Sequence, residues 1–278
     1  MKIRRFDAGP YDVSPVAAGR LLTPGGETRA LWQIAEETPV AILLNGVTFA
    51  VMMMTPADIE DFAVGFALTE GIVETLGDIG GLRIAEAADG MICNVTLDPA
   101  RVEKVEGRRR TLAGRAGCGI CGAQSLEAVL PPPRRVPKAP LPGRDALLAA
   151  FAALPGAQAM KRINKTTHAA AFCDLEGRVR LVREDIGRHN ALDKLGGALA
   201  REGRDAAGGF VLLSSRVSVE MAQKAAALGA PLVAAVSAPS ALALRLAARA
   251  GLTLACRAGG DIMLFDETAL SAPGKETP

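Results

Sequence analysis

The C-terminal half of the sequence alternates short apolar runs with helix-forming segments, and this alternation restricts the fold more than any other feature. GFVLLSS, PLVAAVS and LTLAC have the pattern of strands. The segments between them have the pattern of helices that end at Gly229 and Gly251. Strands that alternate with helices of about a dozen residues form parallel β-α-β units whose helices cover the sheet. The sequence therefore predicts an α/β fold.

Two further strands are expected before this alternation, in TTHAAAFCDLEGRVRLVRED, around a turn at residues 175–177. The segment NALDKLGGALAREG, which follows them, is predicted to be a helix. In open α/β sheets, ligands bind at the carboxyl ends of the strands. We therefore expect the binding loops at residues 214–218, 237–240 and 257–261.

A proline-rich segment, LPPPRRVPKAPLPG, separates an N-terminal portion from this C-terminal half. Its six prolines exclude a helix or a central strand and indicate an extended connector. The predicted organisation has five parts. They are an irregular N-terminal arm over residues 1–27, a smaller α+β portion over 28–129, the connector over 130–143, an α/β core over 144–270 and a tail over 271–278.

The N-terminal portion contains three recognisable elements. Asn45-Gly46 lies between two apolar, β-rich runs and favours a tight hairpin turn. In TPADIEDFAVGFALTEG, Thr55 can cap a helix over residues 56–70 that has Pro56 at its first position and ends at Gly71. The run MICNVTL predicts a strand over residues 91–97.

The composition argues against several classes of protein. A net charge of +2 is too small to indicate a nucleic-acid-binding protein. No stretch approaches the roughly 18 apolar residues that span a membrane, and MKIRRFDAGPYD lacks the apolar centre of a secretory signal. Five cysteines in a long chain indicate reduced thiols in the cytoplasm rather than a disulfide scaffold.

Cys118 and Cys121 form the single C-x-x-C pair, within RAGCGICGAQ. A structural zinc site needs four ligands, and a zinc deaminase needs a glutamate at the position that Ala170 occupies in HAAAF. A dithiol redox couple, a sulfur carrier and a packed thiol pair remain as interpretations. The flanking glycines indicate a flexible loop. The arginines of the preceding EGRRRTLAGR would lower the pKa of Cys118 and favour its thiolate.

Two segments, REDIGRHNALDK and SSRVSVEM, place many polar side chains at the entrance to a predicted helix. Such groups either cap a solvated helix or hold a polar ligand at its N-terminus. Two such junctions in one sheet favour a ligand cleft. The candidate binding residues are Arg188, His189, Ser214, Arg216 and Ser237.

Taken in order and spacing, GCGICG, THAAAF, EDIGRHNALDK, SSRVSVEMAQKAA and VSAPSALALRLA resemble the FdhD family of formate dehydrogenase accessory sulfurtransferases. The resemblance implies a homodimer with a three-layer α/β/α sandwich like that of cytidine deaminase, joined to a smaller N-terminal portion. It also implies that a cysteine desulfurase supplies sulfur as a persulfide. The sulfur would pass to the molybdenum cofactor, in its bis(molybdopterin guanine dinucleotide) form, before that cofactor enters formate dehydrogenase.

The same resemblance implies residue roles. Cys118 would carry the persulfide and Cys121 would assist it. The cofactor-binding segment would consist of Cys256, Arg257, Ala258, Gly259, Gly260 and Asp261. The chain departs from the family pattern in NKTTH, which lacks a glycine before the histidine, and in ACRAGGD, which ends in Asp261 in place of arginine. Backbone N–H groups of the Gly-Gly pair, helped by Arg257, would then contact a phosphate.

Two alternatives belong to other functional classes. One is a chaperone that binds the molybdenum cofactor without sulfur chemistry, and the other is a zinc-dependent nucleotide deaminase. Replacing both cysteines would stop sulfuration by a carrier but not cofactor binding by a chaperone. Metal analysis of the purified protein would identify a deaminase.

Overall fold

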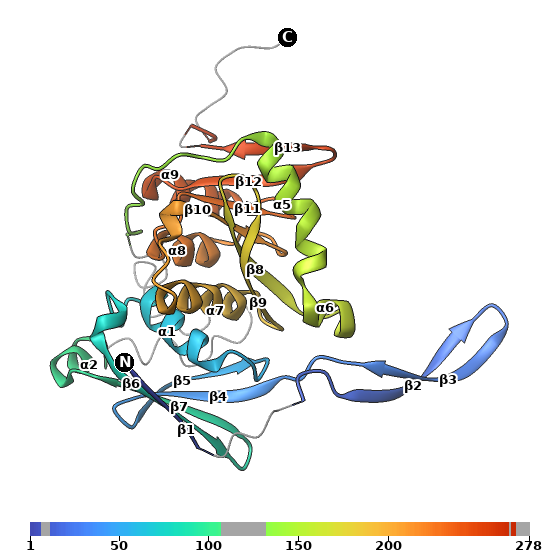
Figure 1. Cartoon of the computed structure of the whole chain (residues 1–278), viewed down its shortest axis with the longest axis horizontal. Helices are drawn as coiled ribbons and strands as arrows, with labels where there is room; N and C mark the ends of the chain where they lie inside the picture. Colours follow the sequence, from blue (N-terminus) through green and yellow to red (C-terminus); the bar gives the residue numbers. More distant parts are fainter. Residues whose placement is uncertain (7–11, 107–131, 267, 271–278) are drawn as a thin grey trace, which may run out of the picture.

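The computed structural model describes residues 1–6, 12–106, 132–266 and 268–270. These residues form a mixed α/β structure with a five-stranded sheet, a six-stranded sheet and a separate two-stranded hairpin (Figure 1). Cys118 and Cys121 lie outside the described residues. None of the described helices is long and apolar enough to cross a membrane.

The six-stranded sheet contains the strands predicted from the alternating pattern. Its strand order is β13-β12-β11-β10-β8-β9. The neighbouring strands β10, β11 and β12 are parallel, as predicted, whereas β8, β9 and β13 run antiparallel to their neighbours. The bounds are β8 (His168–Asp174), β9 (Val179–Asp185), β10 (Gly209–Leu213), β11 (Leu232–Ala235), β12 (Thr253–Ala258) and β13 (Asp261–Phe265).

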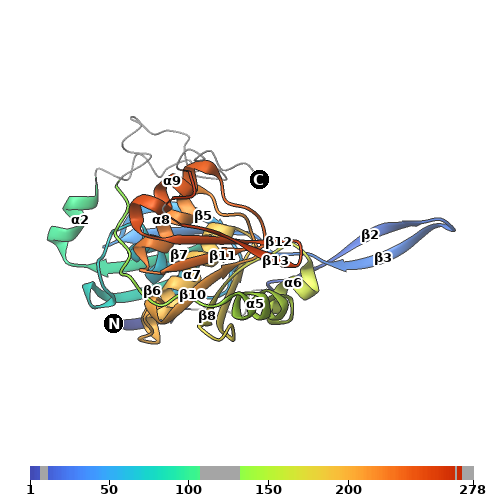
Figure 2. The same cartoon turned by 90° about the horizontal axis from the view of Figure 1, so that it is seen from above.

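Helices cover both faces of this sheet (Figure 2). The predicted helices α7 (Arg188–Arg201), α8 (Val219–Ala227) and α9 (Ala241–Ala250) pack on one face. The other face is covered by α5 (Arg144–Ala157), which is followed by α6 (Ala159–Asn164); neither was predicted. The three-layer arrangement is confirmed, and the likeness to cytidine deaminase stays a prediction.

The five-stranded sheet lies in the N-terminal part, in the order β1-β6-β7-β4-β5. Every second residue of β4 is buried, because that face packs against α1 (Ile59–Thr69). The predicted hairpin is confirmed, since Asn45 and Gly46 have φ angles of 47° and 85°. The strand bounds are β1 (Lys2–Phe6), β4 (Thr38–Leu44), β5 (Val47–Met54), β6 (Ile79–Ala87) and β7 (Gly90–Leu97). The short 3-10 helix η1 (Leu76–Asp78) precedes β6, and α2 (Pro99–Glu106) follows β7. A second 3-10 helix, η2 (Ala206–Gly208), precedes β10 in the core.

The prediction of an irregular arm over residues 1–27 is wrong. The first strand, β1, pairs in parallel with β6, a partner far away in sequence. The strands β2 (Val16–Thr23) and β3 (Gly26–Gln33) form a long antiparallel hairpin. Nearly all its residues are exposed. Without a buried face, the apolar residues do not alternate with polar ones, so the strand period is absent from the sequence.

The start of α1 also differs from the prediction. The helix begins at Ile59 and not at Pro56, and Asp58, in a left-handed conformation, precedes it. Thr55 does not cap the helix, because its hydroxyl accepts a hydrogen bond from the Ile186 N–H at 3.0 Å. A hydrogen bond with Ile186, which is 131 positions away in the sequence, thus replaces the local cap. The predicted end is confirmed, since Gly71 follows the helix with a φ angle of 64°.

The helices α1 and α7 approach each other closely where both have a glycine. A Cβ atom on Gly65 would lie 1.7 Å from the carbonyl oxygen of Asp193, and one on Gly197 would lie 1.8 Å from that of Asp61. Only glycine lets two helix backbones come so near. This contact joins the five-stranded sheet, through α1, to the core that carries α7.

Replacing Gly65 with alanine should destabilise the protein by about 2 kcal/mol or more, because the new methyl group forces two backbones apart. Gly156→Ala is the matched control, since a Cβ there meets nothing within 4 Å. This second change should be neutral or stabilise the helix by about 0.5–1 kcal/mol. Urea unfolding of both variants measures the difference, and equal stabilities would contradict the close contact.

Candidate functional site

One edge of the six-stranded sheet collects most of the polar residues that the sequence predicted to bind a ligand. The carboxyl ends of β10, β11 and β12 lie side by side, with Leu213 opposite Ala235 and Ala235 opposite Cys256. The start of β8 and the end of β9 reach the same edge, where His168 pairs with Asp185. The N-terminus of α7 follows β9 after residues 186–187, and that of α8 follows β10 after the loop of residues 214–218. Two helix N-termini and several polar side chains therefore meet at this edge.

The carboxylate of Asp185 fixes this edge and has no capacity left for a ligand. One oxygen accepts hydrogen bonds from the Gly187 N–H at 2.7 Å and the Asn190 amide at 3.0 Å. The other accepts from Lys194 Nζ at 2.6 Å and from the Thr55 N–H at 3.0 Å. Both charged side chains of the ion pair are fully buried. These residues of EDIGRHNALDK therefore have a structural role.

Three other polar residues of the edge are differently placed, because a buried atom of each side chain has no hydrogen-bond partner within the described part of the chain. These atoms are His168 Nδ1, Arg188 Nε and His189 Nε2. Burying a polar atom without a partner is costly, so each such atom calls for an explanation. A bound ligand that supplies the missing hydrogen bonds is the explanation that we adopt.

The electrostatics of the edge suit an anionic ligand. Burial, followed by the charges of Lys161 and Arg188, lowers the pKa of His168 against an opposing effect of Asp185. Burial, followed by the charges of Arg188 and Lys224, lowers the pKa of His189 to about 4. Both imidazoles are therefore neutral at neutral pH. Arg188 and Lys161, together with the dipoles of α7 and α8, contribute positive charge at the edge, and Glu220 beside His189 opposes it.

The entrance to α8 contributes a second group of polar atoms. Ser218 occupies the N-cap position, but its hydroxyl makes no capping hydrogen bond and has no partner among the described residues. Gln223 Nε2, further along α8, is likewise buried and unpaired within the described chain. Glu220 Oε2 lies 4.0 Å from His189 Nε2, which brings α8 beside the start of α7. Gln223 was missed by the sequence analysis, although its position one turn after Glu220 predicts the same helix face.

Three predicted residues have other roles or positions. The Ser214 hydroxyl accepts the Ala169 N–H at 2.8 Å, and its own N–H donates to the Ala169 carbonyl, so Ser214 extends the β8–β10 pairing. Arg216 and Ser237 are exposed on the loops after β10 and β11. They lie at the predicted edge, where a ligand could reach them from outside.

Within the segment CRAGGD, Gly259 and Gly260 form a two-residue hairpin turn between β12 and β13. Gly259 has a φ angle of 62°, which favours glycine, and Gly260 has space around it. Arg257 Nε donates to the Gly259 carbonyl at 3.2 Å. Asp261 accepts a hydrogen bond from Arg144 Nε at 2.9 Å, so it joins the turn to α5. Cys256 is buried within β12, whereas the residues from Arg257 to Asp261 are exposed.

The cysteines of the described residues are poorly placed for thiol chemistry. Cys93, Cys173 and Cys256 are all buried. Burial, followed by the charge of Glu60, raises the pKa of Cys93 to about 12. Burial, followed by the charge of Asp174, raises that of Cys173 to about 12 as well. Within the described residues, no group of three or more His, Cys, Asp or Glu side chains could hold a metal ion.

The chain is similar to proteins of known families. The sequence model of the FdhD/NarQ family matches residues 35–265. Two proteins called "Sulfur carrier protein FdhD" are 48% and 46% identical, one from Bordetella petrii (81% of this chain, 82% of that protein) and one from Cupriavidus necator (79% and 80%). A crystal structure described as a candidate formate dehydrogenase accessory protein from Desulfotalea psychrophila superposes with a TM-score of 0.72. The sequence of that protein is 24% identical to this chain, and the superposition covers 91% of this chain and 97% of the other.

The low pKa of His189 predicts a stability change with pH. An unfolded histidine has a pKa of about 6.5, so the folded protein resists protonation of His189 until about pH 4. The stability from the neutral imidazole is present above pH 6.5 and is lost as the pH falls toward 4. Between pH 7 and 5 the wild type should lose about 2 kcal/mol more than His189→Asn. Urea unfolding at both pH values tests this, and equal losses would contradict a buried neutral His189.

Proposed function

The chain belongs to the FdhD/NarQ family, and from this we propose that it is a sulfur carrier that serves formate dehydrogenase. Its donor would be a cysteine desulfurase. Its substrate would be the molybdenum cofactor with two guanine dinucleotide tails, which receives sulfur before it enters the enzyme. The names of the relatives, sulfur carrier proteins about half identical over four fifths of the chain, support the carrier role.

The distribution of cysteines carries this proposal. Three of the five cysteines are buried, and burial raises the pKa of each, which disfavours the nucleophilic thiolate. The remaining two are Cys118 and Cys121, three residues apart and outside the described residues. A sulfur carrier needs a reactive thiol, and this pair supplies it.

The transfer of one sulfur atom from the donor to the cofactor would take two steps. First, the Cys118 thiolate attacks the outer sulfur of the donor's persulfide, the donor's S–S bond breaks, and the donor cysteine leaves as a thiolate. Second, the Cys121 thiolate attacks the inner sulfur of the Cys118 persulfide, which releases the outer sulfur as sulfide to the molybdenum. The pair is thereby oxidised to a disulfide while the transferred sulfur is reduced. A cellular dithiol must then reduce the pair before another cycle.

The edge of the six-stranded sheet would hold the guanine dinucleotide tail of the substrate. Arg188 can donate hydrogen bonds to a phosphate, and Ser218 can do so from the start of α8. The N–H groups at the starts of α7 and α8 favour the same negative charge. The exposed turn at Gly259 and Gly260, beyond the end of β12, would contact a more distant phosphate.

Two further features belong to this proposal. A persulfide needs reduced thiols, and so we place the protein in the cytoplasm. We also expect a homodimer. A chaperone that binds the cofactor without sulfur transfer is the second candidate, because binding at the described edge would need no reactive thiol. The cysteine variants below separate the two functions.

Cys118→Ala should reduce the maturation of formate dehydrogenase to background, because the persulfide then has no nucleophile to form on. Cys121→Ala should have an equal or weaker effect. Cys173→Ala is the matched control, since its buried thiol takes no part in transfer and the variant should mature the enzyme. Formate oxidation in cells that depend on each variant measures the effect. Normal maturation with Cys118→Ala would refute the sulfur carrier.

Guanosine diphosphate should bind as a mimic of half a cofactor tail, and more weakly at high salt. Arg188→Gln should weaken this binding about tenfold or more, because it removes a charge-assisted hydrogen bond. Arg180→Gln is the matched control, because Arg180 is paired with Asp174 at the opposite end of β8. Calorimetry at two salt concentrations tests this. Binding that ignores salt, or is equal in both variants, would place the nucleotide elsewhere.

A further inference from the structure

The hairpin of β2 and β3 projects away from the other described elements (Figures 1 and 2). It is called the arm below, and it is not the irregular segment over residues 1–27 that the sequence predicted. It comprises residues 16–33 and joins β4 through a short segment. An isolated two-stranded hairpin is only marginally stable in water and needs a further strand or a packed face. The arm also lies outside the residues that match the family, so the shared chemistry does not depend on it.

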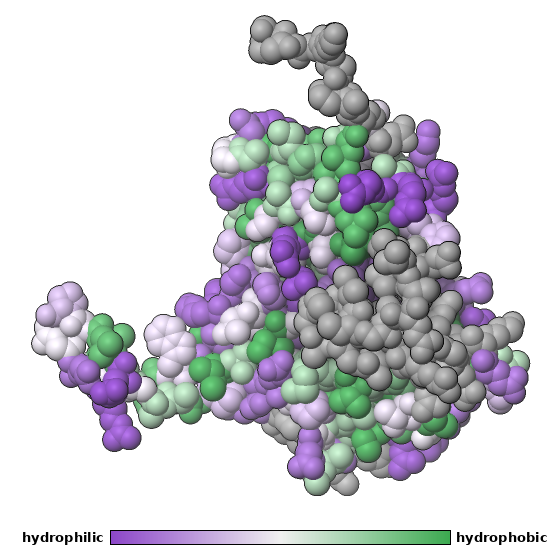
Figure 3. All heavy atoms as spheres, turned by 180° about the vertical axis from the view of Figure 1, so that it is seen from behind, coloured by the Kyte–Doolittle hydropathy of each residue, from purple (hydrophilic) through white to green (hydrophobic). Residues whose placement is uncertain are grey.

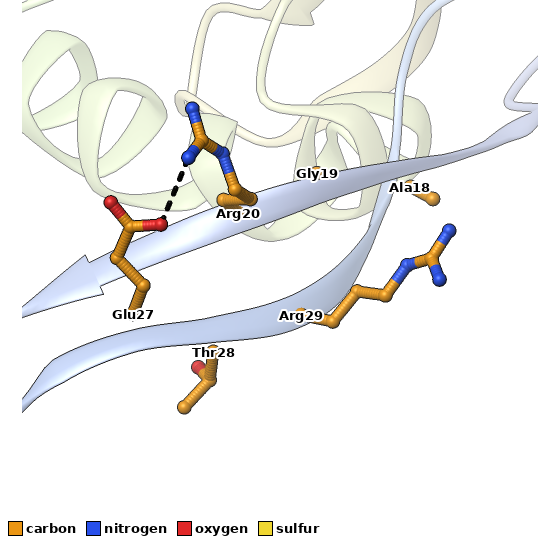
Figure 4. A pocket seen from close by; sticks show the side chains of 6 residues that line it. All are labelled: Ala18, Gly19, Arg20, Glu27, Thr28 and Arg29. Atoms are coloured by element: carbon orange, nitrogen blue, oxygen red, sulfur yellow. Dashed lines mark hydrogen bonds and ion pairs between the residues drawn. The ribbon is translucent and has the colours of Figure 1, made fainter.

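The two faces of the arm differ in charge. One face bears Arg20, Glu27 and Arg29, and Arg20 pairs with Glu27 at 3.0 Å (Figure 4). The same face also bears three exposed apolar side chains, Val16, Leu22 and Leu31. The opposite face has no charged residue. It consists of small or uncharged side chains together with Leu21, which is 49% exposed, and Trp32, which is 55% exposed. This second set is Ala17, Gly19, Leu21, Thr23, Gly26, Thr28, Ala30 and Trp32.

The outer face of the five-stranded sheet is apolar along β5 and β4, whereas Arg83 of β6 and Asn94 of β7 lie on the rest of it. Its inner face packs on α1, whereas Val51 and Met53 of β5 are 61% and 42% exposed on the outer face. The neighbouring positions on that face include Ala41 and Ile92, which are half-buried. A sheet face left in water normally carries polar side chains. Figure 3 shows hydrophobic residues both on the arm and on the lower part of the body.

We infer that the arm of one copy of this chain lies, by its charge-free face, on the outer face of the five-stranded sheet of a second copy, and reciprocally. A partner met only during turnover would leave both apolar surfaces in water for most of the time. A second copy is always present with the arm, so it can cover both apolar surfaces between encounters with other partners. This contact would form the interface of the homodimer that is expected above.

The available area fits such a contact. Eight residues per strand give the arm a length of about 27 Å and a width of about 10 Å. Two arms on two sheets would bury about 1,100 Å² in total, which reaches the size that specific interfaces need, about 1,000 Å². The two contacts are identical by symmetry, as a two-fold dimer requires.

Adjacent leucines of the arm provide matched variants, because Leu21 lies on the charge-free face and Leu22 on the charged one. Leu21→Lys and Val51→Lys should each raise the dimer dissociation constant about tenfold or more, since a buried leucine or valine contributes that much. Leu22→Lys should leave it unchanged within about twofold. Sedimentation velocity of the full chain measures the dissociation constants.

Trp32, the single tryptophan of the chain, gives an independent readout on the wild type. Its emission should shift to longer wavelength as dilution separates the dimer. A monomeric wild type, equal effects of Leu21→Lys and Leu22→Lys, or a neutral Val51→Lys would each overturn the inference. Urea unfolding of the monomeric variants shows whether they are folded, and this readout does not depend on the proposed function.

Discussion

The buried carboxylate of Asp185 is the interaction on which the arrangement of the described chain depends. It accepts four hydrogen bonds, from residues on both sides of the contact between the N-terminal part and the core. Lys194 neutralises it and also donates to the Thr55 carbonyl at 2.9 Å. A buried ion pair adds little net stability, but losing one partner is strongly destabilising. The pair therefore specifies how the two parts meet, and the glycine contact between α1 and α7 lets them come close enough.

The same constraint shapes the candidate site. Because Asp185 fixes the end of β9, α7 begins in one defined position, and Arg188 and His189 lie at the sheet edge. One short motif thus has two roles. Asp185, Asn190 and Lys194 satisfy each other inside the protein, whereas Arg188 and His189 retain buried nitrogens without partners among the described residues. A ligand with phosphate groups would complete those hydrogen bonds without disturbing the fold.

The sequence predicted the elements that have a strong local pattern and missed those that depend on distant partners. The strands and helices from β8 to β12 were predicted because burial imposes clear periods on them. The β2–β3 hairpin was missed because neither of its faces is buried, and Thr55 was misassigned because Ile186 takes its hydroxyl. For the candidate site, the sequence indicated that these polar residues meet at one edge of the sheet, and their role in binding stays a prediction. It could not separate the paired side chain of Ser214 from the unpaired one of Ser218, since that depends on three-dimensional contacts.

We propose that sulfur travels on Cys118 while the sheet edge holds its acceptor. Incubation of the full chain with a cysteine desulfurase and cysteine, followed by intact-mass analysis and peptide mapping, tests this directly. We expect a gain of one sulfur atom on the peptide with Cys118 and Cys121, which a dithiol reductant removes and which is absent from Cys118→Ala. An unchanged mass, or sulfur mapped to Cys93, Cys173 or Cys256, would contradict it.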